Sequence, residues 1–112
     1  MEVKDGKTIP RRRWPKYFSS FTHGNRGRLF KISRFEGEKE QTTLEEELPL
    51  LAVTYDPHHN GTLSISGGED RIEYEHPINE PESVWIDEDE DGWTKSMIIL
   101  DKEGTRTVVS FH

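Results

Sequence analysis

Four large aromatic side chains recur at helical spacing near the start of the chain, and no other feature constrains the fold as strongly. The spacing is i, i+3, i+4 and i+7, which places all four rings on one face of an α-helix. A face made of rings is too apolar to remain in water, so it has to cover another element. The four residues are Trp14, Tyr17, Phe18 and Phe21.

The ends of this helix follow from its proline and its glycine. Pro15 is tolerated only in the first turn, because proline lacks the backbone N–H that later turns need. The helix should therefore begin near Arg12 and run to about His23. Gly24 is expected to end it in a left-handed conformation.

Most of the chain after this helix alternates apolar and polar residues, which is typical of β-strands with one buried face. The segments are short and are separated by turn signals such as Asn60-Gly61. We therefore expect an α+β fold. One N-terminal helix packs on a curved antiparallel sheet, or a small barrel, of six to seven strands in meander order.

Three segments depart from simple alternation. Residues 36–43 are polar throughout and are expected to form an exposed hairpin loop. Pro49 lies near the start of a predicted strand over residues 46–55, which indicates a sheet edge or a bulge. Pro77 and Pro81 are expected to bracket a loop.

The predicted core combines the rings of the helix with one face of each strand. Trp85 alternates with two core positions, so it is expected to face the other way, either covering a second surface or contacting a partner. The core residues are Trp14, Phe18, Phe21, Phe30, Ile32, Val53, Ile65, Ile72, Val84, Ile86, Ile99, Val109 and Phe111.

The composition is compatible with one small folded domain. The chain has 112 residues, of which 33% are charged and 30% hydrophobic. Eleven aromatic residues, namely three Trp, three Tyr and five Phe, can still fill a small core, since each buries about 150–250 Å². We expect residues 1–8 to be a flexible tail and residues 9–112 to be a single β-rich domain.

Several functional classes are excluded or disfavoured by the residue types. The chain contains no cysteine, so it forms no disulfide and supplies no thiolate ligand or nucleophile. Its first residues are polar and no segment reaches the roughly 20 apolar residues of a membrane span. The expectation is a cytoplasmic protein without membrane association and without a cofactor.

Charge is distributed unevenly along the chain. Residues 1–34 carry ten basic and two acidic residues, a net charge of +8, whereas residues 35–112 carry five basic and twenty acidic residues, a net charge of −15. The two parts can attract each other within the fold, or the basic part can contact a partner. The candidate partner-binding residues are Arg11, Arg12, Arg13, Lys16 and Trp85.

Nucleic acid is the alternative partner for this basic segment, because basic side chains neutralise phosphates and aromatic rings stack on bases. However, the helical spacing directs the rings towards the core, and an acidic body repels a polyanion. We therefore expect a protein partner rather than nucleic acid.

An acidic segment suggests a second alternative, weak calcium binding. Asp87, Asp89 and Asp91 precede Gly92 and match the first half of a calcium-binding loop, in which alternate carboxylates surround the ion. The second half does not match, because Ile98 occupies the position of the bidentate glutamate. The other interpretation is a solvated hairpin tip that protects a sheet edge.

Known catalytic motifs are absent from the sequence. It has no G-x-S-x-G, G-x-G-x-x-G, phosphate-binding loop or H-E-x-x-H. The five histidines show no i, i+4 ligand spacing and are interpreted as turn or surface residues. We expect no enzymatic activity and assign no catalytic residue.

Three short motifs, in order, resemble a family of small bacterial proteins classed as a domain of unknown function. They are Ile9-Pro10 followed by an aromatic helix, Leu48-Pro49-Leu50, and the segment 81–85, which reads Pro-Glu-Ser-Val-Trp. The resemblance covers residues 9–112. It implies a bacterial source and a stand-alone domain, and it assigns no catalytic residues.

Overall fold

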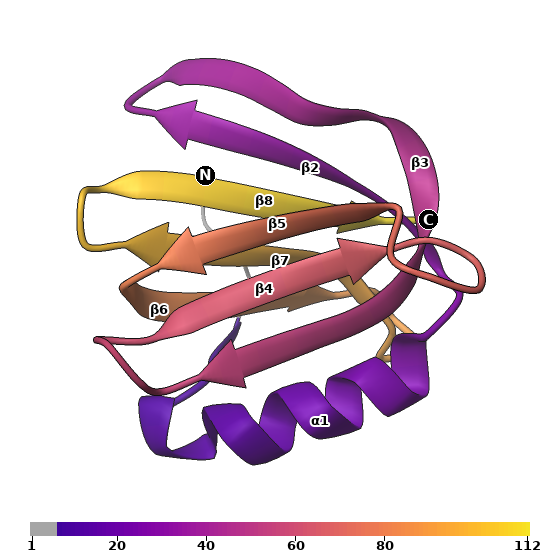
Figure 1. Cartoon of the computed structure of the whole chain (residues 1–112), viewed down its shortest axis with the longest axis horizontal. Helices are drawn as coiled ribbons and strands as arrows, with labels where there is room; N and C mark the ends of the chain where they lie inside the picture. Colours follow the sequence, from indigo (N-terminus) through magenta and orange to yellow (C-terminus); the bar gives the residue numbers. More distant parts are fainter. Residues whose placement is uncertain (1–6) are drawn as a thin grey trace.

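The structure, a computed structural model, describes residues 7–112. One helix packs on an eight-stranded antiparallel sheet that curls without closing (Figure 1). The elements are β1 (Lys7–Thr8), the 3-10 turn η1 (Arg11–Arg13), α1 (Trp14–Asn25), β2 (Leu29–Glu36), β3 (Lys39–Asp56), β4 (Thr62–Gly67), β5 (Tyr74–Asn79), β6 (Pro81–Glu88), β7 (Thr94–Asp101) and β8 (Thr105–Phe111).

The predicted class is confirmed, but the strand count and order differ from the prediction. The order across the sheet is β1-β6-β7-β8-β2-β3-β4-β5. Two meanders, β2 to β5 and β6 to β8, are joined because β8 pairs with β2. A single meander would have placed β5 beside β6. Instead these strands lie at distant positions in the sheet, and only Glu80 connects them, with a φ of 52°.

Strand β3 gives the sheet its curvature. Its first half pairs with β2 up to Pro49, and its second half pairs with β4 from Leu50 onward, with a register shift between Leu50 and Ala52. Figure 1 shows β3 sweeping around one side of the molecule, so that β4 and β5 lie in front of β6 to β8. At the bulge predicted near Pro49, the chain therefore passes from the layer that contains β2 to the layer that contains β4 and β5.

The crossing point requires a glycine on the neighbouring strand. A Cβ atom at Gly67 would lie 2.8 Å from the ring of Phe30, closer than any real contact. Phe30 is fully buried at this point. The absent side chain at position 67 therefore lets the two layers close on this ring.

Helix α1 covers one end of the curled sheet, the lower end in Figure 1, and the predicted aromatic face of the helix is turned towards the sheet. Trp14, Phe18 and Phe21 are buried, and the edge of Trp14 meets Tyr55 of β3 at a centroid distance of 5.1 Å. Phe21 packs on Phe111 of β8 at 5.5 Å. The helix therefore contacts strands that belong to both meanders.

The predicted helix ends are displaced by two residues. Residues 11–13 form a 3-10 turn, and α1 begins at Trp14 with Pro15 in its first turn. Gly24 does not terminate the helix. Asn25 is still helical, and the left-handed residue is Gly27, with a φ of 91°.

Two predicted loops are strands in the structure. The polar segment 36–43 contains only a tight turn, because β2 ends at Glu36 and β3 begins at Lys39. This hairpin projects into solvent and so needs no apolar face. Strand β5 continues through Pro77, which is tolerated because β5 is a terminal strand of the sheet.

The predicted core is correct except for Ile72, which is 59% exposed. Ile72 lies in the loop before β5, outside the sheet, so alternation with Tyr74 does not bury it. Lys7 and Thr8, two residues of the predicted tail, form β1. The remaining residues of that tail, 1–6, lie outside the described residues. Buried hydrophobic residues that were not in the predicted core are Leu50, Leu63, Ile78 and Met97.

Candidate functional site

A basic groove lies between the N-terminal segment and α1. Its cavity has a volume of about 500 Å³. Strand β1 and Ile9 form one wall, with the Ile9 N–H donating to the carbonyl of Val84 at 3.0 Å. Turn η1 and the exposed side of α1 form the other. The basic residues that line the groove are Lys7, Arg12, Arg13 and Lys16.

Three of the predicted partner-binding residues are thereby brought together. Arg12, Arg13 and Lys16 are exposed and line this one cavity. Three consecutive residues cannot all face one way on a short helical turn. The structure therefore separates Arg11 from its two neighbours.

Arg11 points away from the groove lining and contacts Trp14 and β6. Its guanidinium lies 4.7 Å from the centre of the Trp14 ring, and Nη2 donates to the carbonyl of Pro81 at 2.6 Å. The indole N–H of Trp14 donates to the carbonyl of Ile9 at 2.7 Å. These contacts attach η1 to β6 and fix Ile9, which lines the groove, to the start of α1.

The groove continues past Tyr17 towards the β6–β7 turn, where Glu88 is the one acidic side chain among the described residues that line it. Lys7 pairs with Glu88 at 3.2 Å. Burial, followed by the charge of Glu88, raises the pKa of Tyr17 to about 12, so this phenol stays neutral. Beyond it, a second hollow of about 380 Å³ is lined by Trp93, which is 54% exposed.

Trp85, the fifth predicted partner-binding residue, does not line the groove. It lies on the outer face of β6, paired with Ile98 and with Thr8, and is 45% exposed. Its direction opposite to Val84 and Ile86 follows the predicted alternation.

The structure does not bring the three predicted calcium ligands together. Asp87 in β6 lies 3.8 Å from the ammonium of Lys95. Asp89 accepts backbone N–H groups from Asp91 and Trp93 at 2.9 and 3.0 Å, which fixes the turn. Within residues 7–112, no three acidic or histidine side chains converge as metal ligands would. The carboxylate of Asp89 stabilises a hairpin tip.

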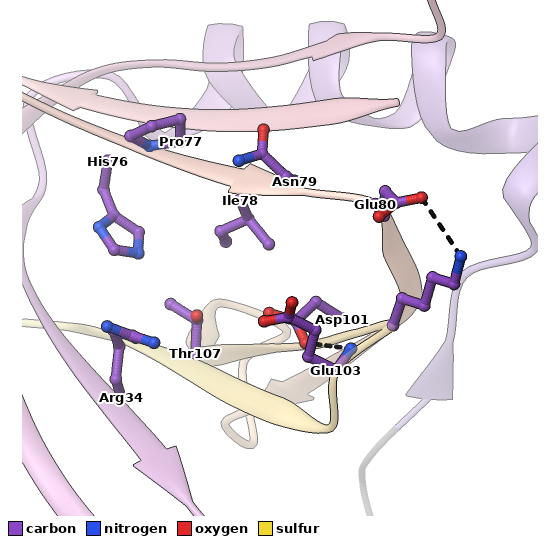
Figure 2. Close-up of a pocket in the computed structure, with 10 residues that line it drawn as sticks. Arg34, His76, Pro77, Ile78, Asn79, Glu80, Asp101, Glu103 and Thr107 are labelled. Carbon is purple, nitrogen blue, oxygen red and sulfur yellow. Dashed lines mark hydrogen bonds and ion pairs between the residues drawn. The ribbon is translucent and has the colours of Figure 1, made fainter. Parts of the chain in front are cut away.

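A separate cavity of about 290 Å³, which within residues 7–112 shares no lining residue with the groove, lies where the curled sheet remains open (Figure 2). His76 and Ile78 enter it from β5, whereas Arg34 and Thr107 enter from β2 and β8 on the opposite wall. Asp101 and Glu103 lie towards the other end of this cavity.

His76 is held against Tyr74 on the same face of β5. Their rings are parallel to within 2° at a centroid distance of 6.4 Å, and the Tyr74 hydroxyl lies 3.4 Å from Nδ1 of His76. Burial lowers the pKa of His76, and the charge of Arg34 lowers it further. The imidazole is therefore neutral near pH 7.

From the sequence, His76 is expected to be a turn or surface residue, and no motif singles out Arg34. For both residues, the alternation along the strand indicates which face of the sheet they occupy. Arg34 continues the alternation of Phe30 and Ile32, and His76 continues that of Tyr74, so each falls on an inner face. Only the curling of the sheet places these two inner positions opposite each other.

The fold and these cavities define a small α+β domain in which one helix covers a curved, open antiparallel sheet. The chain belongs to the family of unknown function DUF5335, whose family model matches residues 5–112. The family resemblance noted in the sequence is thereby confirmed.

A bacterial relative supports this assignment. An uncharacterized protein of Aquifex aeolicus is 28% identical over 103 residues, which cover 92% of this chain and 88% of the relative. No solved structure matches the chain. In the part of the chain that the structure describes, no helix has the length and apolar character needed to cross a membrane.

Proposed function

We propose that this protein is a non-catalytic binding domain whose basic groove receives an acidic segment of another protein. The observation that carries the proposal is the convergence of Lys7, Arg12, Arg13 and Lys16 on one cavity of about 500 Å³. Complementary charge speeds association and selects the partner, so a segment rich in Asp and Glu fits this surface.

The chemistry of the groove supports a peptide partner over nucleic acid. Stacking on bases requires accessible rings, but Trp14 and Phe18 are buried and Tyr17 is half-buried. The chain has a net charge of −7, and Glu88 lies at one end of the groove. A long polyanion would meet this negative charge, whereas a short acidic segment would not.

A direct comparison of two probes tests the proposal. Fluorescence anisotropy would measure binding of a labelled, glutamate-rich peptide of about ten residues and of a single-stranded RNA of about ten nucleotides. At about 50 mM salt the peptide should bind saturably and more tightly than the RNA. Binding should weaken at about 300 mM salt, because the Debye length shortens.

A pair of double variants provides the control. Arg12→Glu with Arg13→Glu should weaken peptide binding at least tenfold. Lys39→Glu with Arg71→Glu changes the net charge by the same amount at exposed positions outside the groove, and should leave the affinity within about twofold. Tighter binding of RNA, no peptide binding, or equal loss in both variants would contradict the proposal.

A further inference from the structure

The cavity between β5 and β8 has a charge arrangement that the groove does not share. Within residues 7–112, β5 pairs with β4 on one side and has no strand on the other. The open side faces the inner surface of β2 and β8, and the cavity of about 290 Å³ lies between them (Figure 2).

One end of this cavity presents hydrogen-bond donors. Arg34 on β2 lies opposite Thr107 on β8 in the strand register, and both side chains point towards His76 across the gap (Figure 2). Arg34 pairs with Glu36 at 3.3 Å, but both side chains are partly exposed. An ion pair between exposed side chains contributes little to stability, so Arg34 can leave Glu36 to bind the carboxylate of a ligand.

The other end presents carboxylates. Asp101 accepts the backbone N–H groups of Glu103 and Thr105 through one oxygen, at 2.9 and 3.0 Å, so its second oxygen remains for another donor. Glu103 lies beside it, and Glu80 pairs with Lys102 at 3.7 Å. Three carboxylates and one ammonium leave this end negative.

The strand register sets the separation of the two ends. Ile99 on β7 pairs with Thr107, and Asp101 lies two residues beyond Ile99 on the same face. The offset along the strands is about 7 Å, and across the sheet Asp101 lies one strand spacing, about 4.8 Å, from Thr107 and two from Arg34. Between the ends, the side chain of Ile78 supplies an apolar surface.

We propose that this cavity binds a small free α-amino acid. Arg34 and Thr107 receive its carboxylate, Asp101 and Glu103 receive its ammonium, and Ile78 contacts its side chain. Opposite charges at opposite ends match a zwitterion better than a simple ion, because each end repels an ion of its own sign.

Other ligand classes fit this cavity less well. A divalent cation prefers several oxygen ligands, whereas Arg34 and Lys102 bring positive charge and no three ligands converge in the described residues. An anion such as phosphate would meet the carboxylates of Asp101 and Glu103. The phosphates of a nucleotide would meet the same two carboxylates.

The test is an NMR titration of the ¹⁵N-labelled full chain. Glycine, L-alanine and the other protein amino acids would be added in turn, with acetate and methylammonium as probes that carry only one of the two charges. At least one amino acid should shift the amides of Arg34, His76 and Glu103 saturably. Acetate and methylammonium should bind at least tenfold more weakly, since each contacts one end only.

Three variants distinguish a built site from general charge effects. Arg34→Gln and Glu103→Gln should each weaken amino-acid binding at least tenfold. Arg106→Gln is the matched control, because Arg106 lies on the outer face of β8, 4.9 Å from the ring of Phe35, and should leave binding unchanged. A dispersed amide spectrum of each variant would verify folding.

Three outcomes would overturn the proposal. They are no saturable shift with any amino acid, equal binding of acetate or methylammonium alone, and equal loss of binding in Arg106→Gln. Arg34 and Glu103 do not line the basic groove. If the cavity binds no amino acid, the proposal that the groove binds an acidic segment is therefore unaffected. If the groove binds no acidic peptide, the amino-acid proposal is likewise unaffected.

Discussion

At the scale of single residues, Trp14 joins strand β3, the N-terminal segment and turn η1. It is buried against Tyr55 of β3, it donates to the carbonyl of Ile9, and Arg11 lies on its ring. A ring that is apolar at its centre and polar at its N–H can serve both packing and attachment. The shape of the basic groove therefore depends on a residue inside the core.

His76 makes a prediction about pH at the same scale. Its pKa is lowered from the ordinary value of 6.5 by burial and then by Arg34, so the unfolded chain binds this proton more readily than the folded chain. The contribution of a neutral His76 to the free energy of unfolding is therefore complete above about pH 6.5 and is lost as the pH falls towards the folded pKa.

Urea unfolding at about pH 7.5 and pH 5.5 would measure this loss. Wild-type protein should lose more stability between the two values than His76→Gln, which has no group to protonate. His23→Gln, changed at an exposed position of α1, should lose as much as wild type. An equal loss in wild type and His76→Gln would contradict the assignment of a buried neutral imidazole.

At the scale of elements, the end of α1 shows how a local signal can be displaced. Both Gly24 and Gly27 are compatible with a helix stop in the sequence. The structure places Gly24 inside the helix with open space around it, and Gly27 beyond the end with a φ of 91°. The N–H of Gly27 donates to the carbonyl of Leu50 at 2.8 Å, so the stop is set where the chain meets β3.

The two glycines should therefore respond in opposite directions. Gly24→Ala should raise the free energy of unfolding by about 0.5–1 kcal/mol, because glycine weakens a helix interior. Gly27→Ala should lower it by about 1–2 kcal/mol, because a Cβ atom disfavours the left-handed conformation. Urea denaturation of both variants measures the difference, and a destabilising Gly24→Ala would place the helix stop at residue 24 instead.

At the scale of the whole molecule, strand β8 unites two halves that are each local in sequence. It pairs with β7 on one side and with β2 on the other, across about two-thirds of the chain. Its inner face carries Thr107, Val109 and Phe111 into the core, and Phe111 also meets the helix. Removing this strand would leave two separate sheet edges and an uncovered core.

A shortened chain tests this role. A protein that ends at Gly104 lacks β8 and should show no cooperative urea transition and no near-ultraviolet circular dichroism, because each remaining half is too small to fold alone. A chain that ends at Phe111 loses exposed His112 with its bond to the Leu29 carbonyl and its pair with Glu47, but keeps all of β8 and should still unfold cooperatively. A sigmoidal transition at the wild-type midpoint without β8 would show that the halves fold independently.

Much of the fold could be predicted from local patterns. The spacing of Trp14, Phe18 and Phe21 predicted a buried helical face, and alternation predicted the inner face of most strands. The pattern failed where burial depends on a neighbour that is distant in sequence. Ile72 alternates correctly but lies outside the sheet, and the polar residues 36–43 form strand and turn without needing a core.

The two candidate sites also differ in how far local sequence patterns predict them. Arg12, Arg13 and Lys16 are recognisable in the sequence because they are consecutive or one turn apart. Arg34, His76 and Glu103 come from separate strands and strand connections, and no local pattern relates them.

The amino-acid sequence alone determined which side chains must avoid water, and with them the helix, the strands and the α+β class, because burial follows a period that is readable over a few residues. Tertiary structure alone decided that β8 joins β2, that β3 turns between two layers, and that an arginine, a histidine and three carboxylates face one cavity. The physical reason is that pairing between distant strands depends on the total fit of two surfaces, and no single segment carries that information.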